Sequence, residues 1–172
     1  MAVYRETRNI ERSASQAIRE ILSDNNFTKV TVVKSMKEVY DLHFDPKEKE
    51  AIISVKVSNT VHQNWELGSL LTQRKPLIII SIYGSSEGQI LDLKDLLCSS
   101  LKNGFDYYEY TILGGVSVDA TYESGATADG KVNVETISDL EVNLGDDKST
   151  LNIRDRHRWQ INLSCSKSKL ES

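Results

Sequence analysis

Proline and cysteine are both scarce in this chain of 172 residues. With only Pro46 and Pro76, long extended linkers are not expected. Cys98 and Cys165 are too few for a disulfide scaffold and lack the spacing of metal ligands, so their apolar neighbours predict buried free thiols. No apolar run is long enough to cross a membrane, and the first nine residues lack the apolar stretch of a signal peptide. The sequence therefore predicts an intracellular protein with no membrane partner.

Length and composition favour one globular domain. Hydrophobic residues make up 39% of the chain and charged residues 27%, values typical of folded rather than disordered or fibrous proteins. A chain of this length buries a sizeable core without disulfides or metals. We therefore expect residues 1–172 to form a single domain, with an α+β core over 1–122 and a β-rich extension of the same domain over 123–172.

The net charge of −4 disfavours a large surface for duplex DNA, because such surfaces normally carry an excess of basic residues. The charges are nevertheless segregated. Residues 123–150 hold seven carboxylates against two lysines, and residues 151–172 hold five basic residues against two acidic ones. Two interpretations remain open: a pair of solvated faces, or complementary patches that meet within one chain or between copies. The second makes a candidate interface of Glu141, Asp146, Asp147, Arg154, Arg156 and Arg158.

Hydrophobic periodicity predicts two main helices. Apolar residues recur at helical spacing over residues 10–22, and polar residues fill the other face. The second helix spans residues 86–103. Ser86 fits its N-cap, Gln89 fits the N3 position of a capping box, and Gly104 fits the residue that ends the helix.

Alternating and continuous apolar runs predict the strands. The strongest is Leu77–Tyr83, whose near-continuous apolar run indicates burial on both faces, and Pro76 suits its first position. The expected strands span residues 29–36, 40–44, 51–57, 77–83, 107–113, 116–122, 140–144 and 159–165. Together they predict an α+β fold: a mixed, mostly antiparallel sheet with two main helices packed on one side.

The sequence shows no catalytic constellation. His43, His62 and His157 are far apart, and none has a second ligand at metal-binding spacing. The acidic residues of 45–50 suggest a metal-dependent nuclease, but a charged turn beside Pro46 fits a solvated loop better than a rigid metal site. We therefore predict no catalytic residue, no metal and no cofactor.

A polar loop is expected over residues 58–74, between two predicted strands. Long loops in ordinary domains are usually functional or disordered. Trp65, Glu66 and Leu67 lie within it, and apolar side chains such as those of Trp65 and Leu67 often anchor interfaces. The alternative is that Trp65 folds back onto its own core. The loop is thus a candidate contact with another subunit.

Residues 66–104 resemble the neck and tail-terminator (tail-completion) proteins of tailed bacteriophages. The resemblance lies in the ELGS loop at 66–69, the RKP turn at 74–76, the buried strand at 77–83 and the GQILDL opening of a helix at 88–93. The order of elements also matches over the first two-thirds of the chain. These motifs reflect packing and capping, so they are less specific than a catalytic signature.

The resemblance implies a structural virion protein. Such a subunit forms a ring, usually sixfold, that terminates the tail tube and joins it to the head connector, with DNA passing through the lumen. Its partners are then copies of itself, the tail tube protein and neck or connector proteins, and it resides in the virion after assembly in the host cytoplasm. Two alternatives remain: a head-completion or adaptor protein that binds the portal, and a cytosolic enzyme or nucleic-acid-processing accessory.

Overall fold

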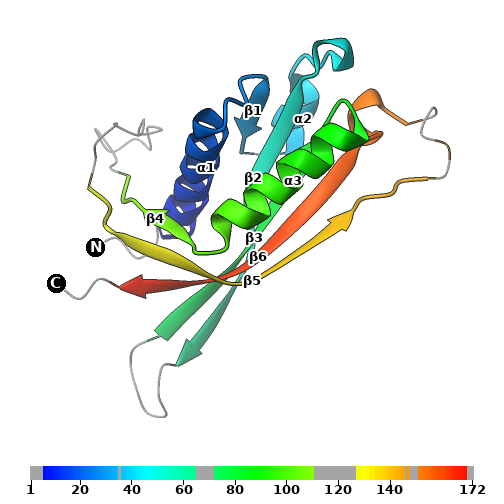
Figure 1. Cartoon of the computed structure of the whole chain (residues 1–172). Coiled ribbons are helices and arrows are strands. Elements are labelled where there is room, and N and C mark those ends of the chain that lie inside the picture. Colours follow the sequence, from blue (N-terminus) through cyan, green and yellow to red (C-terminus); the bar gives the residue numbers. More distant parts are fainter. Residues whose placement is uncertain are drawn as a thin grey trace.

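The computed structural model describes residues 6–34, 36–64, 72–110, 127–145, 147 and 151–169. Among these residues six strands form one sheet in the order β1-β2-β3-β6-β5-β4, and only the β1–β2 pair is parallel (Figure 1). The strands are β1 (Val30–Val33), β2 (Ala51–Asn64), β3 (Thr72–Tyr83), β4 (Phe105–Tyr107), β5 (Gly130–Glu141) and β6 (Arg158–Lys169). The helices are α1 (Glu6–Asp24), α2 (Met36–Asp41) and α3 (Glu87–Leu101). This arrangement confirms the predicted α+β class.

The two long helices, α1 and α3, pack on one face of the sheet, which we call the helix face. Alternate side chains of β2, β3 and β6 point to this face because successive residues of a strand point to opposite sides. Ile80 pairs with Val55 on one side and Ile161 on the other, and all three side chains are fully buried. The apolar stripe predicted for α1 meets this layer through Ile10, Ala14, Ile18 and Leu22.

Helix α3 begins after Ser86, as its sequence predicts, and ends at Leu101, two residues before the predicted end. The Ser86 side chain accepts a hydrogen bond from the Gln89 amide at 3.3 Å. The Gln89 side chain accepts from the amide of Ser85 at 2.8 Å, one residue before the N-cap. Gly104 follows the helix with a φ of +83°, and a Cβ there would lie 2.1 Å from the carbonyl oxygen of Val132, so only glycine fits.

Helix α2 corrects two of the predicted strands. The strand predicted over 29–36 ends at Val33, and the strand predicted over 40–44 is wrong because residues 36–41 are helical. The helix covers the face opposite α1 and α3, where Val39 is fully buried and Phe44 nearly so, in a cluster with Ile52. Packing on a second, small core therefore overrides the weak β preference of this segment.

The loop predicted over 58–74 is also wrong for most of its length. Strand β2 continues to Asn64 and β3 begins at Thr72, so the two strands form a long hairpin. Pro76 accordingly lies inside β3, opposite Thr60, rather than at its first position. Among the described residues β3 first pairs with β6 at residue 77, so the missing N–H of Pro76 falls outside that ladder, where proline is tolerated. Trp65, Glu66 and Leu67 lie outside the described residues.

The C-terminal third of the chain, predicted as a β-rich extension, supplies two strands of the same sheet, β5 and β6. The strand predicted over 140–144 is wrong, because β5 spans 130–141 and residues 142–144 follow it. The strand predicted over 159–165 is confirmed and extends to residue 169. Of the hairpin predicted over 107–122, residue 107 lies in β4, residues 108–110 are not in a strand, and residues 111–126 lie outside the described residues. Strand β6 lies between β3 and β5.

Candidate functional site

The end of the β2–β3 hairpin projects from the sheet at the bottom of Figure 1. We call residues 58–64 of β2 and 72–76 of β3 the arm. Among the described residues the arm strands pair only with each other, because β1 ends its pairing at Ser54 and β6 begins its pairing at Leu77. A β-bulge between Val57 and Asn59 marks the point where the arm leaves the sheet. The arm is therefore a pair of strands that extends beyond the rest of the sheet.

Charged side chains hold the base of the arm. The carboxylate of Glu6, at the start of α1, lies 2.8 Å from a guanidinium nitrogen of Arg74 in the arm and 2.8 Å from the Nζ of Lys167 in β6. The Lys167 side chain is only 5% exposed, and its ammonium lies 3.9 Å from the ring centre of Tyr107. Burial raises the pKa of Tyr107 to about 12. One carboxylate thus connects a helix, the arm and a central strand.

Polar side chains of α1 tie the same region together. The Glu11 carboxylate accepts a hydrogen bond from the backbone N–H of Val57, beside the bulge, at 3.0 Å. The Ser13 hydroxyl accepts from the N–H of Tyr108 at 3.0 Å. These bonds satisfy backbone donors where strand pairing is interrupted or ends, which lowers the cost of burying them. The arm therefore leaves the sheet in a defined direction.

The predicted arginine run, residues 154–158, lies against α2 and the loop that follows it. Arg154 donates a hydrogen bond to the carbonyl of Leu42. Arg158 lies 3.9 Å from Asp155 and covers the ring of Tyr83 at 4.8 Å. Asp155 also accepts a hydrogen bond of 2.8 Å from the Tyr40 hydroxyl. Burial, followed by this bond, raises the pKa of Tyr40 to about 12.

The predicted acidic partners lie on and after β5. Asp139 accepts a hydrogen bond from the Trp159 indole at 2.9 Å and lies 3.8 Å from Lys94, and Glu135 lies 3.4 Å from Lys75. Of the predicted interface residues, Glu141 ends β5, Asp147 lies beyond it, Arg156 lies in the arginine run, and Asp146 lies outside the described residues. Pairing between the acidic segment and Arg154, Arg156 or Arg158 stays a prediction.

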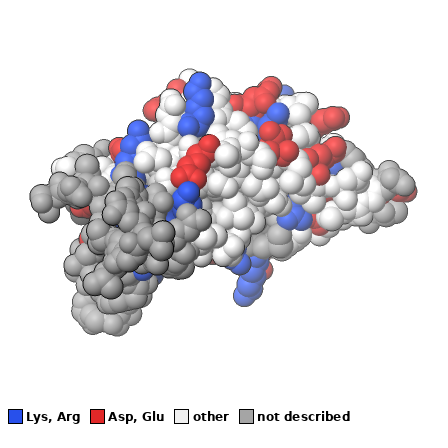
Figure 2. Space-filling view, turned by 90° about the horizontal axis from the view of Figure 1, so that it is seen from below, with Lys and Arg blue, Asp and Glu red and all other residues white. Residues whose placement is uncertain are grey.

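The sheet face opposite α1 and α3 carries few charges beyond the part that α2 covers. We call it the open face. Its paired positions run across the four central strands as Ser54, Ser81, Gln160 and Leu140, then Lys56, Ile79, Asn162 and Ser138, then Asn59, Leu77, Ser164 and Thr136. Figure 2, which views the molecule from the side on which the arm projects, shows a broad uncharged area with the charged side chains gathered toward its borders. These rows contain one lysine and no carboxylate.

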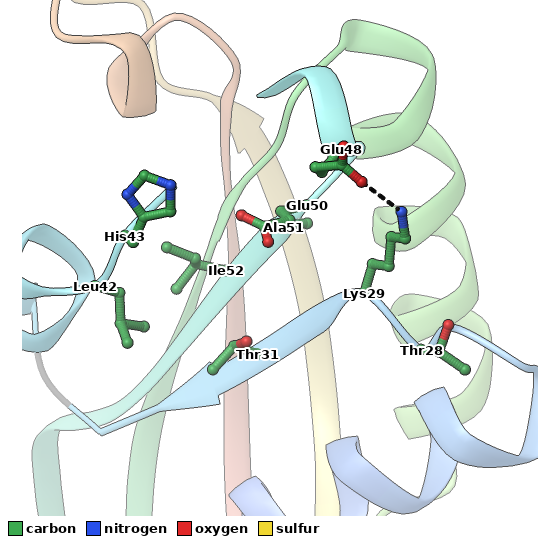
Figure 3. Close-up of a pocket in the computed structure, with 9 residues that line it drawn as sticks. All are labelled: Thr28, Lys29, Thr31, Leu42, His43, Glu48, Glu50, Ala51 and Ile52. Atoms are coloured by element: carbon green, nitrogen blue, oxygen red, sulfur yellow. Dashed lines mark hydrogen bonds and ion pairs between the residues drawn. The ribbon is translucent and has the colours of Figure 1, made fainter. Parts of the chain in front are cut away.

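A hollow of about 270 Å³ lies at the start of the parallel β1–β2 pair (Figure 3). Its lining includes His43, Glu48, Glu50 and Lys29, of which the last forms an ion pair of 3.2 Å with Glu48. The side chains in this pair are 64% exposed for Glu48 and 58% exposed for Lys29. A solvent-exposed ion pair of this kind contributes little to the stability of the fold.

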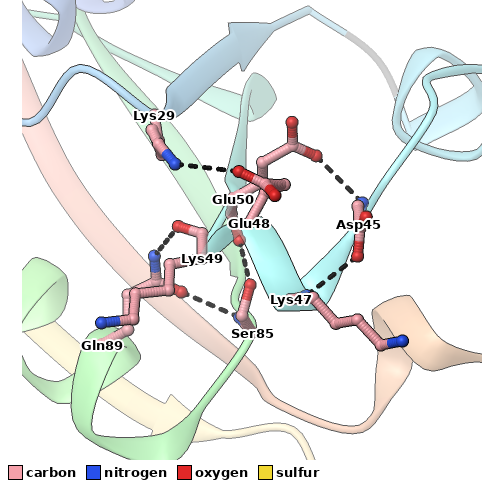
Figure 4. A network of polar contacts seen from close by, with 8 residues as sticks. All are labelled: Lys29, Asp45, Lys47, Glu48, Lys49, Glu50, Ser85 and Gln89. Carbon is pink, nitrogen blue, oxygen red and sulfur yellow. Dashed lines mark hydrogen bonds and ion pairs between the residues drawn. The ribbon is translucent and has the colours of Figure 1, made fainter.

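The carboxylates of the predicted acidic turn have structural partners (Figure 4). Asp45 caps the 3-10 helix Pro46–Glu48 by accepting from the N–H of Lys47 at 2.9 Å, and Glu50 accepts from the N–H of Asp45 at 2.9 Å. The Gln89 amide donates to the carbonyl of Lys49 at 2.6 Å, which connects this turn to α3. The turn is thus a brace between α3 and the sheet.

Within the part of the chain that the structure describes, no three His, Cys, Asp or Glu side chains are grouped so that they could hold a metal ion. No helix among these residues combines the length and the apolar character needed to cross a bilayer. Cys165 is fully buried, as predicted, whereas Cys98 is only partly buried, and both are free thiols. No protein-family model matches the chain, and no curated protein matches it.

Proposed function

We propose that this chain is a structural subunit of the neck of a tailed bacteriophage, forming a ring that terminates the tail tube. The observation that carries the proposal is the arm, a long hairpin that projects from a helix-covered sheet. Its flanking elements follow the order of the resemblance, with α1 before the hairpin and the capped helix α3 after the buried part of β3. A projecting hairpin suits a subunit whose work is to contact other subunits.

The open face supports the same proposal from its charge. DNA that passes through a protein ring must not be held by its phosphates, and phosphate binding grows with the number of lysines and arginines on the surface. The three paired rows of the open face consist of Ser, Thr, Asn and Gln side chains together with Leu77, Ile79 and Leu140, and Lys56 is their one cation, with Lys75 opposite Val61 as a further lysine on this face. Such a face lining a lumen would let DNA slide.

The proposal is tested by electron microscopy of the purified chain, alone and mixed with purified tail tubes. We expect rings with sixfold symmetry that cap one end of the tubes. Twelvefold rings that bind the portal, and not the tube, would assign the chain to the adaptor class instead. A chain that stays monomeric under both conditions would overturn the proposal of a ring.

A further inference from the structure

The outer edge of β5 is long and carries no neighbouring strand among the described residues. Strand β4 is the last strand in the sheet order, and it pairs with β5 only from Gly130 to Val132. From residue 134 to residue 140 the described pairing of β5 is with β6 alone. A strand edge of this length is a template for pairing with another strand unless charge or shape prevents it.

The charges on β5 select which strand can pair with this edge. Residues 133–141 contain Glu135, Asp139 and Glu141 and no lysine or arginine. Antiparallel pairing of this edge with the same edge of a second copy would gather carboxylates along both strands, which is unfavourable. The edge is therefore biased against a symmetric dimer and toward a strand of opposite charge.

The arm has the opposite charge. Residues 58–64 and 72–76 contain no carboxylate and two cations, Arg74, which is paired with Glu6 of its own chain, and Lys75. Within one chain Lys75 already lies 3.4 Å from Glu135, but the two side chains remain 33% and 40% exposed. A pair so solvated is weak, so it can be exchanged for partners in a second chain at little cost.

Exposed apolar side chains give a second, independent match. Val61 in the arm is 47% exposed, and Leu140 near the end of β5 is 46% exposed. Register places both on the open face, because Val61 is two residues beyond Asn59, which pairs with Leu77, and Leu140 pairs with Gln160. A strand that adds to β5 in the plane of the sheet with its open face turned the same way places its open-face side chains on the same side as Leu140.

We propose that the arm of one copy adds as a strand to the outer edge of β5 in a second copy, with Val61 and Leu140 on the same side of the joined sheet. The contact rests on the proposed function, since it is the means by which the ring closes. Two different surfaces meet, so each copy offers its arm to one neighbour and its β5 edge to the other. Such head-to-tail contacts form closed rings when the rotation between copies closes, and filaments when it does not.

Disulfide trapping between two populations of the chain tests this contact. One population carries Val61→Cys and the other Leu140→Cys, both with Cys98→Ala to remove the partly exposed native thiol. The two are mixed, allowed to assemble, oxidised and analysed on a non-reducing gel. We expect a heterodimer band several-fold stronger than in the control mixture, in which Lys56→Cys replaces Val61→Cys. Lys56 is an exposed open-face residue of β2 that lies before the arm.

Hydrogen exchange gives a readout that needs no substitution. On assembly of the wild-type chain, backbone amides within residues 134–140 should gain protection, because half of the amides of an edge strand point away from its existing partner. Rings that form without this protection, and with no cross-link above the control, would overturn the inference while leaving the ring intact. Cross-linked open chains without any ring would support the contact and reject the ring. A chain that neither assembles nor cross-links would reject both.

Discussion

The centre of the sheet beneath α3 and the base of the arm are both buried, but different side chains fill them. Between α3 and the sheet, Leu97 of the helix and Ile80 and Ile161 of the strands are aliphatic and fully buried. At the base of the arm, Glu6 and Lys167 form an ion pair at 15% and 5% exposure. Apolar packing is insensitive to partner identity as long as volume is conserved, whereas a buried charge depends on one partner. The first region therefore supplies stability, and the second fixes the direction of the arm.

The largest effect should come from the apolar centre. Leu97→Ala removes a fully buried side chain of α3, so we expect the free energy of unfolding to fall by about 2–5 kcal/mol. Denaturant unfolding followed by circular dichroism measures this loss. Leu96→Ala, one position along the same helix at a partly exposed site, is the matched control and should cost less. Equal losses in the two variants would contradict the packing of α3 on the sheet.

Alkaline pH should reveal the burial of Cys165 on the same side of the sheet. Burial raises the pKa of its thiol from 9.0 to about 12. The folded state therefore favours the neutral thiol. The stability that this preference adds to the free energy of unfolding is complete below pH 9 and is lost as the pH rises toward 12. Over that range the wild-type chain should lose about 1.4 kcal/mol per pH unit more than Cys165→Val does. Parallel stability curves for the two proteins would show that the thiol is accessible when folded.

The base of the arm should respond to loss of one charge. Glu6→Gln leaves the buried ammonium of Lys167 without its carboxylate, and we expect a loss of about 1–3 kcal/mol in the free energy of unfolding. Adding Lys167→Met should recover part of this loss, because the orphaned charge is then removed as well. Glu48→Gln is the control, because the ion pair of Glu48 with Lys29 is mostly exposed to solvent. Its loss should lower the free energy of unfolding by less than about 1 kcal/mol. If the double variant is less stable than Glu6→Gln alone, the ion pair is not the source of the effect.

The smallest effect concerns the cap of α3, which lies outside both regions. Ser86→Ala removes the acceptor for the Gln89 amide and should cost about 1 kcal/mol. Ser86→Asp restores an acceptor and should keep wild-type stability. Thermal unfolding of the three proteins distinguishes a capping role from a packing role. Aspartate supplies an acceptor oxygen in place of the hydroxyl, but its side chain is larger than that of serine.

The parts of the fold that were predictable from the sequence are those with strong local signals. The stripe of α1 and the cap and stripe of α3 follow from helical periodicity, and the central strands follow from apolar runs. Helix α2 was missed because its short segment carries no helical stripe, and its structure depends on packing against Ile52. The strands of the arm were not predicted because residues 58–64 are mostly polar. Pairs of polar residues such as His62 and Arg74 leave no alternating apolar pattern in the sequence.

The candidate site was predictable only in part, for a related reason. The sequence pointed to residues 58–74 as a contact region, but it expected a loop where the structure has paired strands. The ion pairs of Glu6 were not expected, because they join residues far apart in the chain. One signal was present: Lys167 follows Ile161, Leu163 and Cys165 at alternate positions of β6, so a lysine falls where the strand points inward.

The position of β6 in the sheet has a consequence for how the chain folds. Strands β2 and β3 are close in sequence and form a hairpin, so their pairing needs only local loop closure. Ile80 of β3, in contrast, pairs with Ile161 of β6, and the chain must close a loop that contains α3, β4 and β5. Contacts of such high sequence separation form slowly. Until β6 emerges from the ribosome and docks, β3 presents an uncovered edge that includes Ile78, Ile80 and Ile82, so chaperone demand during synthesis should be set by this last strand.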